Sequence, residues 1–226
     1  MHQLWPPVSR LLASALREGT GYSEFFLAVA RAYAGGRGLS SSIHHLIKLL
    51  ERLQPTPELS LRSALLYVEK LGAGGYAPVV VDCLGLPELY WLYAKLREAQ
   101  PRALAVYAYV NETGRTSGFL EEVRKASMLQ VATTLGGQKV SSLDRILHEV
   151  MSKPAQLEEL ARKAHTHFGA YVEELARLLP TRAFIVSDHG YDFAREGDLW
   201  YLEHGREPNI LSKLAPLVVV EKHYIY

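Results

Sequence analysis

Three aspartates, three histidines and one threonine in this sequence have the chemistry of a metal-assisted active site. They are Asp82, Thr116, Asp144, His148, Asp188, His189 and His204. Carboxylate oxygens and imidazole nitrogens are good ligands for divalent metals, and an activated hydroxyl is a nucleophile. Two neighbouring metals can stabilise both the attacking and the leaving oxygen of a phosphoryl transfer. This chemistry requires that the surrounding elements bring the seven residues together.

The strongest local signal lies in the segment 183–190. The apolar run Ala183–Val186 has the composition of a buried strand, and it stops at Ser187-Asp188-His189-Gly190. A second apolar run, Pro78–Val81, stops at Asp82 in the same way. Ligands of an open α/β sheet bind beyond the carboxyl ends of its strands, so we expect both junctions at one binding site. A strand-to-turn junction with solvated polar residues is the alternative for each junction alone.

Helical periodicity runs through residues 1–75, and a different pattern begins at about residue 76. Apolar residues at three- and four-residue spacing predict helices over 8–16, 22–33 and 43–53, and Thr56-Pro57 is typical of the start of a fourth. Beyond residue 76, strands are expected at 78–81, 102–110, 183–186, 200–202 and 217–220, and helices at 87–97, 117–126, 143–150 and 156–179. The alternation predicts an α/β fold, with a mostly parallel sheet flanked by helices, and an N-terminal helical appendage over 1–75.

The composition narrows the classes of function. The net charge of the 226 residues is +1, so no global field draws the chain to nucleic acid or to a membrane surface. No run of about 18 apolar residues occurs, and we expect no contact with the bilayer interior. The single cysteine, Cys83, permits no internal disulfide, which favours the cytoplasm. Glycine-rich nucleotide-binding motifs are absent from the sequence, which argues against a Walker-type ATPase or a dinucleotide enzyme.

Weaker signals support the second half of the candidate site. Asp144 and His148 are four residues apart, so they share one face of the helix expected at 143–150. The preceding segment, Gln138–Leu143, does not have the pattern of a strand. His165 and His167 are alternative ligands, although two residues on a helix at this spacing point about 200° apart.

The nucleophile has three candidates in one turn, Thr113, Thr116 and Ser117. Thr116 is favoured because it falls where a helix begins, and the free backbone N–H groups of a helix start face an incoming phosphate. Cys83 is interpreted as a buried small residue.

Four segments together resemble the alkaline phosphatase superfamily, and within it the PglZ domain. They are Val80-Val81-Asp82, Asp144 with His148, Ser187-Asp188-His189-Gly190, and His204-Gly205. The resemblance covers about residues 76–221 and implies a parallel-sheet core with two adjacent divalent metals, commonly zinc, with manganese as the second choice. It implies that Asp82, Thr116, Asp188 and His189 hold one metal, and that Asp144, His148 and His204 hold the other. Cys83 lacks the Cys-x-Pro-x-Arg pattern of the related sulfatases.

The resemblance implies a metal-dependent phosphohydrolase with Thr116 as the catalytic residue. We expect a phosphodiesterase that acts on a nucleotide or a nucleic-acid phosphoester, a substrate class that comes from the PglZ resemblance alone. A different class of protein is the alternative, namely a catalytically silent PglZ-like binding module in a defence or signalling assembly. In either case the N-terminal helices could dock a protein partner.

Overall fold

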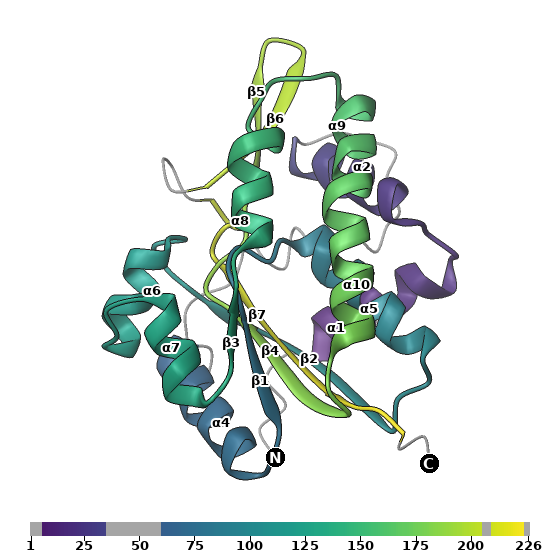
Figure 1. Cartoon of the computed structure of the whole chain (residues 1–226). Coiled ribbons are helices and arrows are strands. Elements are labelled where there is room, and N and C mark those ends of the chain that lie inside the picture. The colour runs from purple at the N-terminus through teal and green to yellow at the C-terminus, as the bar shows by residue number, and fades with distance from the viewer. Residues whose placement is uncertain (1–5, 35–59, 205–208, 224–226) are drawn as a thin grey trace.

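The computed structural model describes residues 6–34, 60–204 and 209–223, and the side chains from residue 12 onward. Its centre is a five-stranded sheet with the strand order β2-β7-β4-β1-β3 (Figure 1). β1 is parallel to β3 and β4, whereas β7 is antiparallel to both β4 and β2. The strands are β1 Ala77–Val81, β2 Ala103–Val110, β3 Gln138–Val140, β4 Arg182–Ser187 and β7 Leu214–Glu221. The prediction of an α/β protein is confirmed, and the sheet is mixed, because β7 runs antiparallel to the other four strands.

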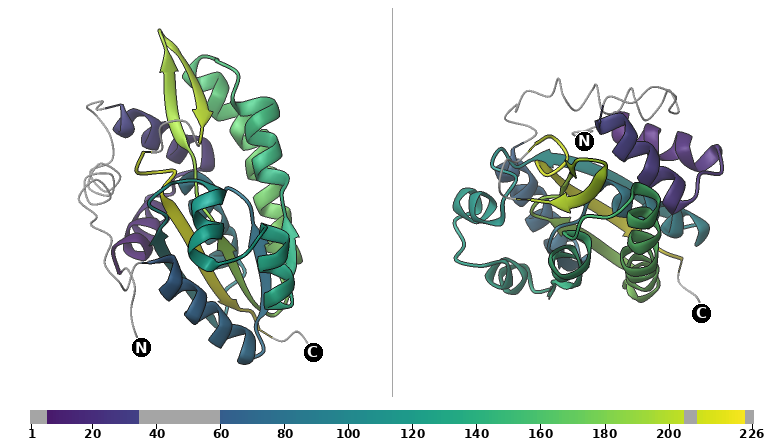
Figure 2. Two further views of the ribbon diagram at one scale, coloured as in Figure 1. Left: turned by 90° about the vertical axis from the view of Figure 1, so that its left-hand side faces the viewer. Right: turned by 90° about the horizontal axis from the view of Figure 1, so that it is seen from above.

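Helices cover both faces of this sheet and bury two hydrophobic cores (Figures 1 and 2). Successive side chains of β4 point to opposite faces of the sheet. Ala183 and Ile185 therefore belong to one core, and Phe184 and Val186 belong to the other. One face is covered by α4 Leu61–Ala73, α6 Thr116–Val123 and α7 Met128–Leu135. The other is covered by α1 Pro6–Arg17, α2 Tyr22–Tyr33, α5 Leu86–Glu98, α8 Ser142–Ile146, α9 Leu157–Ala164 and α10 Ala170–Leu178.

The N-terminal helices contribute to these same two cores. Phe25 and Phe26 of α2 are fully buried with residues of α5 and of the sheet, and Phe25 stacks on Tyr90 of α5 with ring centroids 4.0 Å apart. Tyr22 of α2 also donates a buried hydrogen bond to Glu88 of α5. α4 packs instead on the opposite face, with Val68 buried against the second core. Within the described ranges, the helices before residue 75 therefore share their packing with the α/β part.

A β-hairpin beside the sheet carries the chain toward His204. It consists of β5 Asp192–Glu196 and β6 Leu199–Glu203, and it lies above the carboxyl ends of β1 and β4 (Figure 1). Ala155 and Trp200 exchange two backbone hydrogen bonds, with N–O distances of 2.9 and 2.7 Å. This bridge joins the hairpin to the segment that follows Asp144 and His148, and so ties together two parts of the candidate site.

Several local predictions were incomplete or wrong. Residues Gln138–Val140 do form a strand, β3, which pairs with β1 at the edge of the sheet. The single helix expected over 156–179 contains a π-helical turn at His165–Gly169, and a second π-helical turn, Leu147–Met151, follows α8. α7 and β5 had no counterpart in the prediction. The helix expected over 43–53 and the start expected at Thr56-Pro57 lie outside the described residues. No helix in the described ranges combines the length and apolar character needed to span a membrane.

Candidate metal centre

The sheet brings the two strand-end aspartates side by side. β1 and β4 are adjacent and parallel, and Val81 is paired in register with Ser187. Asp82 and Asp188, the residues that follow this pair, therefore lie side by side at the carboxyl ends of the two strands. Both are buried, as is His189. One ligand atom from each of these three residues lies within 4.8 Å of the other two.

Thr116 joins these three residues from the start of α6. Its Oγ1 donates a hydrogen bond to Asp188 Oδ2 at 2.7 Å and lies 3.1 Å from His189 Nε2. His189 Nε2 is in turn 3.3 Å from Asp188 Oδ2. We call Asp82, Thr116, Asp188 and His189 the inner group. It contains the residues that the sequence analysis assigned to one metal.

The ring orientation of His189 suits a metal ligand. His189 Nδ1 lies 2.7 Å from the carbonyl oxygen of Gly190, so Nδ1 carries a hydrogen and Nε2 faces the inner group. Nε2 and Asp188 Oδ2 both lie within hydrogen-bonding distance of the Thr116 hydroxyl. Imidazole nitrogen, carboxylate and hydroxyl oxygens that converge in this way fit a divalent metal.

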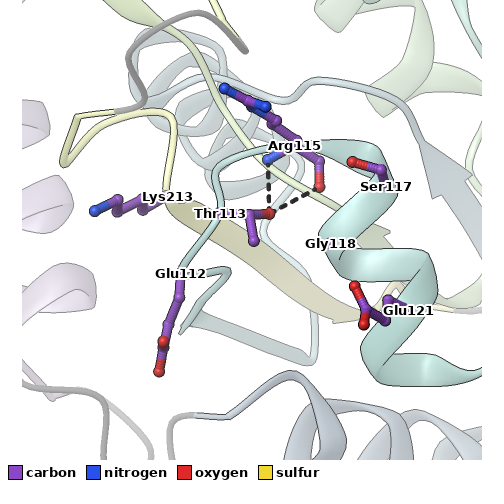
Figure 3. Close-up of a pocket in the computed structure, with 7 residues that line it drawn as sticks. All are labelled: Glu112, Thr113, Arg115, Ser117, Gly118, Glu121 and Lys213. Carbon is purple, nitrogen blue, oxygen red and sulfur yellow. Dashed lines mark hydrogen bonds between the residues drawn. The ribbon is translucent and has the colours of Figure 1, made fainter.

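A polar turn between β2 and α6 holds Thr116 in position. The side-chain amide of Asn111, at the end of β2, donates to the carbonyl oxygens of Asp188 and Arg115, each at 2.9 Å. Thr113 Oγ1 donates to Asn111 Oδ1 at 2.8 Å and accepts from the Arg115 amide at 3.3 Å (Figure 3). A Cβ on Gly118 would lie only 1.9 Å from Thr113 Oγ1. The turn therefore depends on glycine there and on the Thr113 hydroxyl.

Asp144, His148 and His204 form a second set, which we call the outer group. His204 Nε2 lies 3.2 Å from Asp144 Oδ1 and 3.1 Å from His148 Nε2. His148 Nε2 is 3.4 Å from Asp144 Oδ1. Ligands of one zinc ion, at about 2.0–2.1 Å from the metal, are separated from one another by about 3.4 Å in a tetrahedral arrangement. The three atoms therefore already have the spacing of a metal-binding set.

The two groups are neighbours. The ring centroids of His189 and His204 are 4.7 Å apart. The outer group is more exposed than the inner one, because the side chain of His148 is 58% accessible whereas that of His189 is fully buried. The centre is therefore most open to solvent at His148.

The electrostatics of the centre favour a cation. Burial and the charge of Asp188 raise the pKa of Asp82, although Lys139 Nζ, 3.0 Å from Asp82 Oδ2, opposes this. The hydrogen bond from His204 lowers the pKa of Asp144. Burial, with the charges of Asp188 and Asp144, raises the pKa of the Cys83 thiol. Three carboxylates converge here, and a divalent ion would offset their mutual repulsion.

The alternative candidates lie elsewhere or have other partners. His165 packs against the rings of Tyr22 and Trp91, with centroids 5.5 and 6.1 Å away. Neither His165 nor His167 belongs to a metal-binding set found among the described residues. The hydroxyl of Thr113 is used within the turn. Ser117 lines a neighbouring pocket of about 380 Å³ (Figure 3).

Sequence reasoning missed three residues that shape the centre. Asn111 supports Thr116, Lys139 pairs with Asp82, and Cys83 lies close to the outer group. Asn111 could have been predicted from the sequence, because it is a polar residue directly after an apolar strand, like Asp82 and Asp188. Lys139 and Cys83 carried none, because their positions depend on the pairing of β3 and on the turn after β1.

Comparisons with known proteins gave no match: no family model, no curated protein and no solved structure is similar to this chain. The site is therefore interpreted from its own geometry and from the sequence resemblance.

Proposed function

We propose that this chain is a metal-dependent phosphohydrolase with a core like that of the alkaline phosphatase superfamily and its PglZ branch. The observation that supports the proposal is the position of the Thr116 hydroxyl. It lies within hydrogen-bonding distance of both Asp188 and His189, and a second set of metal-type ligands is adjacent. An isolated structural metal site would not need a hydroxyl at the start of a helix.

Each group would hold one divalent metal, zinc or manganese. The inner metal would take Asp82, Thr116, Asp188 and His189, and the outer metal Asp144, His148 and His204. Such ions supply positive charge that stabilises the oxygens whose charge grows during phosphoryl transfer. The nitrogen and oxygen ligands present here suit zinc, and a more oxygen-rich set also suits manganese.

The residues of the chain have distinct tasks in this proposal. Thr116 Oγ1 attacks phosphorus, and its proton passes to Asp188 Oδ2, the nearer acceptor. The P–O bond to the leaving alcohol breaks, and the leaving oxygen takes a proton from solvent. Water then hydrolyses the threonine ester and restores the hydroxyl. The backbone N–H groups at the start of α6 face the phosphate oxygens and stabilise their charge, because no side chain caps this helix start.

Two pockets lined by residues of the centre or by their neighbours in the sequence support a diester rather than a monoester. One, of about 380 Å³, is lined by Arg115 and Ser117, which flank Thr116 in the sequence, and by Lys213, Glu112 and Glu121. The other, of about 370 Å³, is lined by His148, His204 and Tyr201. A phosphodiester has two organic groups and could fill both pockets, and we propose a nucleotide or nucleic-acid phosphoester as the substrate class.

Two further parts of the proposal concern the setting of the protein. A reducing compartment, the cytoplasm, suits a chain whose only cysteine lies beside the candidate centre. A protein partner could dock on the N-terminal helices, where Arg31 of α2 and Glu158 of α9 form an exposed ion pair at 2.9 Å.

The test is hydrolysis of a bis-aryl phosphate by protein reconstituted with zinc or manganese. We expect activity in the wild type, a loss of roughly a thousandfold or more in Thr116→Ala with its metal content retained, and most of the activity in the matched control Ser117→Ala. If the metal-loaded wild type hydrolyses no phosphate ester, the chain is instead a silent binding module. If Thr116→Ala is as active as the wild type, Thr116 is not the nucleophile.

A further inference from the structure

Cys83 lies on the buried side of the outer group. Its Sγ, one carboxylate oxygen of Asp144 and one ring nitrogen of His204 lie within 4.8 Å of one another. The more exposed His148 contacts the same two residues, with Nε2 3.4 Å from Asp144 Oδ1 and 3.1 Å from His204 Nε2. Asp144 and His204 therefore have both a histidine and a thiol as neighbours.

The backbone positions this thiol with some strain. Cys83 has a φ of +64°, a left-handed conformation that a residue with a Cβ adopts at a cost. The Cys83 amide donates to Asp188 Oδ1 at 3.2 Å, and the next amide, of Leu84, donates to Ser187 Oγ at 3.0 Å. These bonds hold the turn after β1, and Cys83, which is only 2% exposed, lies beside Asp144 and His204.

Packing alone does not account for all of these surroundings. Cys83 belongs to the first hydrophobic core, as a buried small residue does, but its thiol also has polar neighbours. This thiol has one weak contact of its own, to the carbonyl oxygen of Gly190 at 3.5 Å. Its other polar neighbours, Asp144 and His204, are groups that bind metals.

We propose that Cys83 is a thiolate ligand of the outer metal, in one set with Asp144, His148 and His204. This inference rests on the proposed metal centre and deepens it. A zinc ion binds sulfur at about 2.3 Å and nitrogen or oxygen at about 2.0–2.2 Å, which places ligand atoms about 3.5 Å apart. Because the three ligand atoms lie within 4.8 Å of one another, a side-chain shift of about 1 Å is enough to bring them to that spacing.

Under this proposal the two metals differ in their ligands and therefore in the metal ion that each site prefers. The outer ion would have four protein ligands including a soft sulfur, which selects zinc, cobalt or cadmium over manganese and magnesium. It could accept a substrate oxygen only as a fifth ligand. The inner ion would have ligands of oxygen and nitrogen only. Substrate would then bind mainly through the inner group.

The test is the electronic spectrum of the full chain reconstituted with Co²⁺. A cobalt–thiolate bond gives a near-ultraviolet charge-transfer band that oxygen and nitrogen ligands do not give. Cys83 is the only cysteine, so such a band can come from no other residue. We expect the band in the wild type and its loss in both Cys83→Ser and Cys83→Ala. We also expect zinc affinity at one site to fall about a hundredfold or more in these variants. That is more than the loss of a residue that only hydrogen-bonds to a metal ligand would cause.

The number of bound cobalt ions tests the two-metal centre, and the charge-transfer band tests the role of Cys83. Two cobalt ions per chain without a thiolate band would overturn the role of Cys83 and leave the proposed function standing. A band with a single bound cobalt would support Cys83 and contradict the two-metal centre. No cobalt binding would overturn both. The wild-type spectrum decides even if neither variant folds, and binding of manganese by the variants at the inner group shows that they do.

Discussion

Asp188 is the residue through which the parts of the centre contact one another. Its Oδ1 accepts from the Cys83 amide and its Oδ2 from the Thr116 hydroxyl, while its backbone oxygen accepts from Asn111. Asp188 is fully buried, so its charge is poorly screened by water. The side chain thus connects the turn after β1, the start of α6 and the end of β4.

Asp188→Asn removes this charge and keeps the size of the side chain. We expect the variant to lose high-affinity zinc or manganese binding at one site, because an amide is a far weaker ligand than a carboxylate. Metal content by elemental analysis is the measurement. The control is Asp198→Asn, whose side chain is 98% exposed in the β5–β6 hairpin. Full metal stoichiometry in a folded Asp188→Asn protein would contradict the assignment of the inner group.

His148→Ala and His204→Ala test whether the outer group is one site. We expect each variant to lose about one metal per chain. We expect the double variant to lose no more, because substitutions of residues that bind the same metal ion do not act additively. His167→Ala, in an exposed position on the π-helical turn, should keep both metals. Independent losses from the two single variants, adding up in the double variant, would show that the histidines serve different sites.

At the scale of elements, the parallel pairing of β1 with β4 made part of the centre predictable. Both strands are apolar runs that end at an aspartate, so the pattern alone indicated where Asp82 and Asp188 would lie. β3 was not predictable, because its three residues, Gln138–Val140, sit at a sheet edge with little burial and carry no apolar period. The antiparallel direction of β7 depends on long-range packing, which a local pattern does not contain.

The contact between α2 and α5 should make stability depend on pH. Burial raises the pKa of Glu88 to about 7, against the hydrogen bond from Tyr22. The folded protein therefore keeps a proton that the unfolded chain loses near pH 4.3. The unfolded state binds fewer protons over this interval, so stability falls as the pH rises from about 4.5 to about 7 and is constant above.

Glu88→Gln should remove this contribution, because the amide is neutral at every pH. We expect the change in the free energy of unfolding between pH 5 and pH 8 to differ from the wild type by about 3 kcal/mol. Urea denaturation at the two pH values is the measurement. Glu98→Gln, on the exposed side of the same helix, is the control and should match the wild type. An unchanged pH dependence in Glu88→Gln would show that Glu88 is charged in the folded protein.

At the scale of the whole molecule, metal binding should stabilise the fold. The inner group draws on β1, α6 and β4, and the outer group on α8, the π-helical turn after it and the segment after β6. A ligand at a thousand times its Kd adds about 4 kcal/mol. For a chain of this size, we expect a chelator to lower Tm by roughly 10 °C. An unchanged Tm after complete removal of metal, checked by elemental analysis, would contradict this coupling.

The position of β7 has a consequence for synthesis. β2 pairs with β7 along eight residues, from Ala103 with Glu221 to Val110 with Leu214, and β7 alone among the described strands is its neighbour in the sheet. Just over 100 positions separate Val110 from Leu214, which a ribosome needs about 5 to 20 s to translate. During that interval β2 has no strand to pair with, and Asn111 links the turn that carries Thr116 to the sheet through the carbonyl oxygen of Asp188. The newborn chain can thus pair β1 with β4 and bring their aspartates together first, and β2 takes its place beside them only when β7 is inserted.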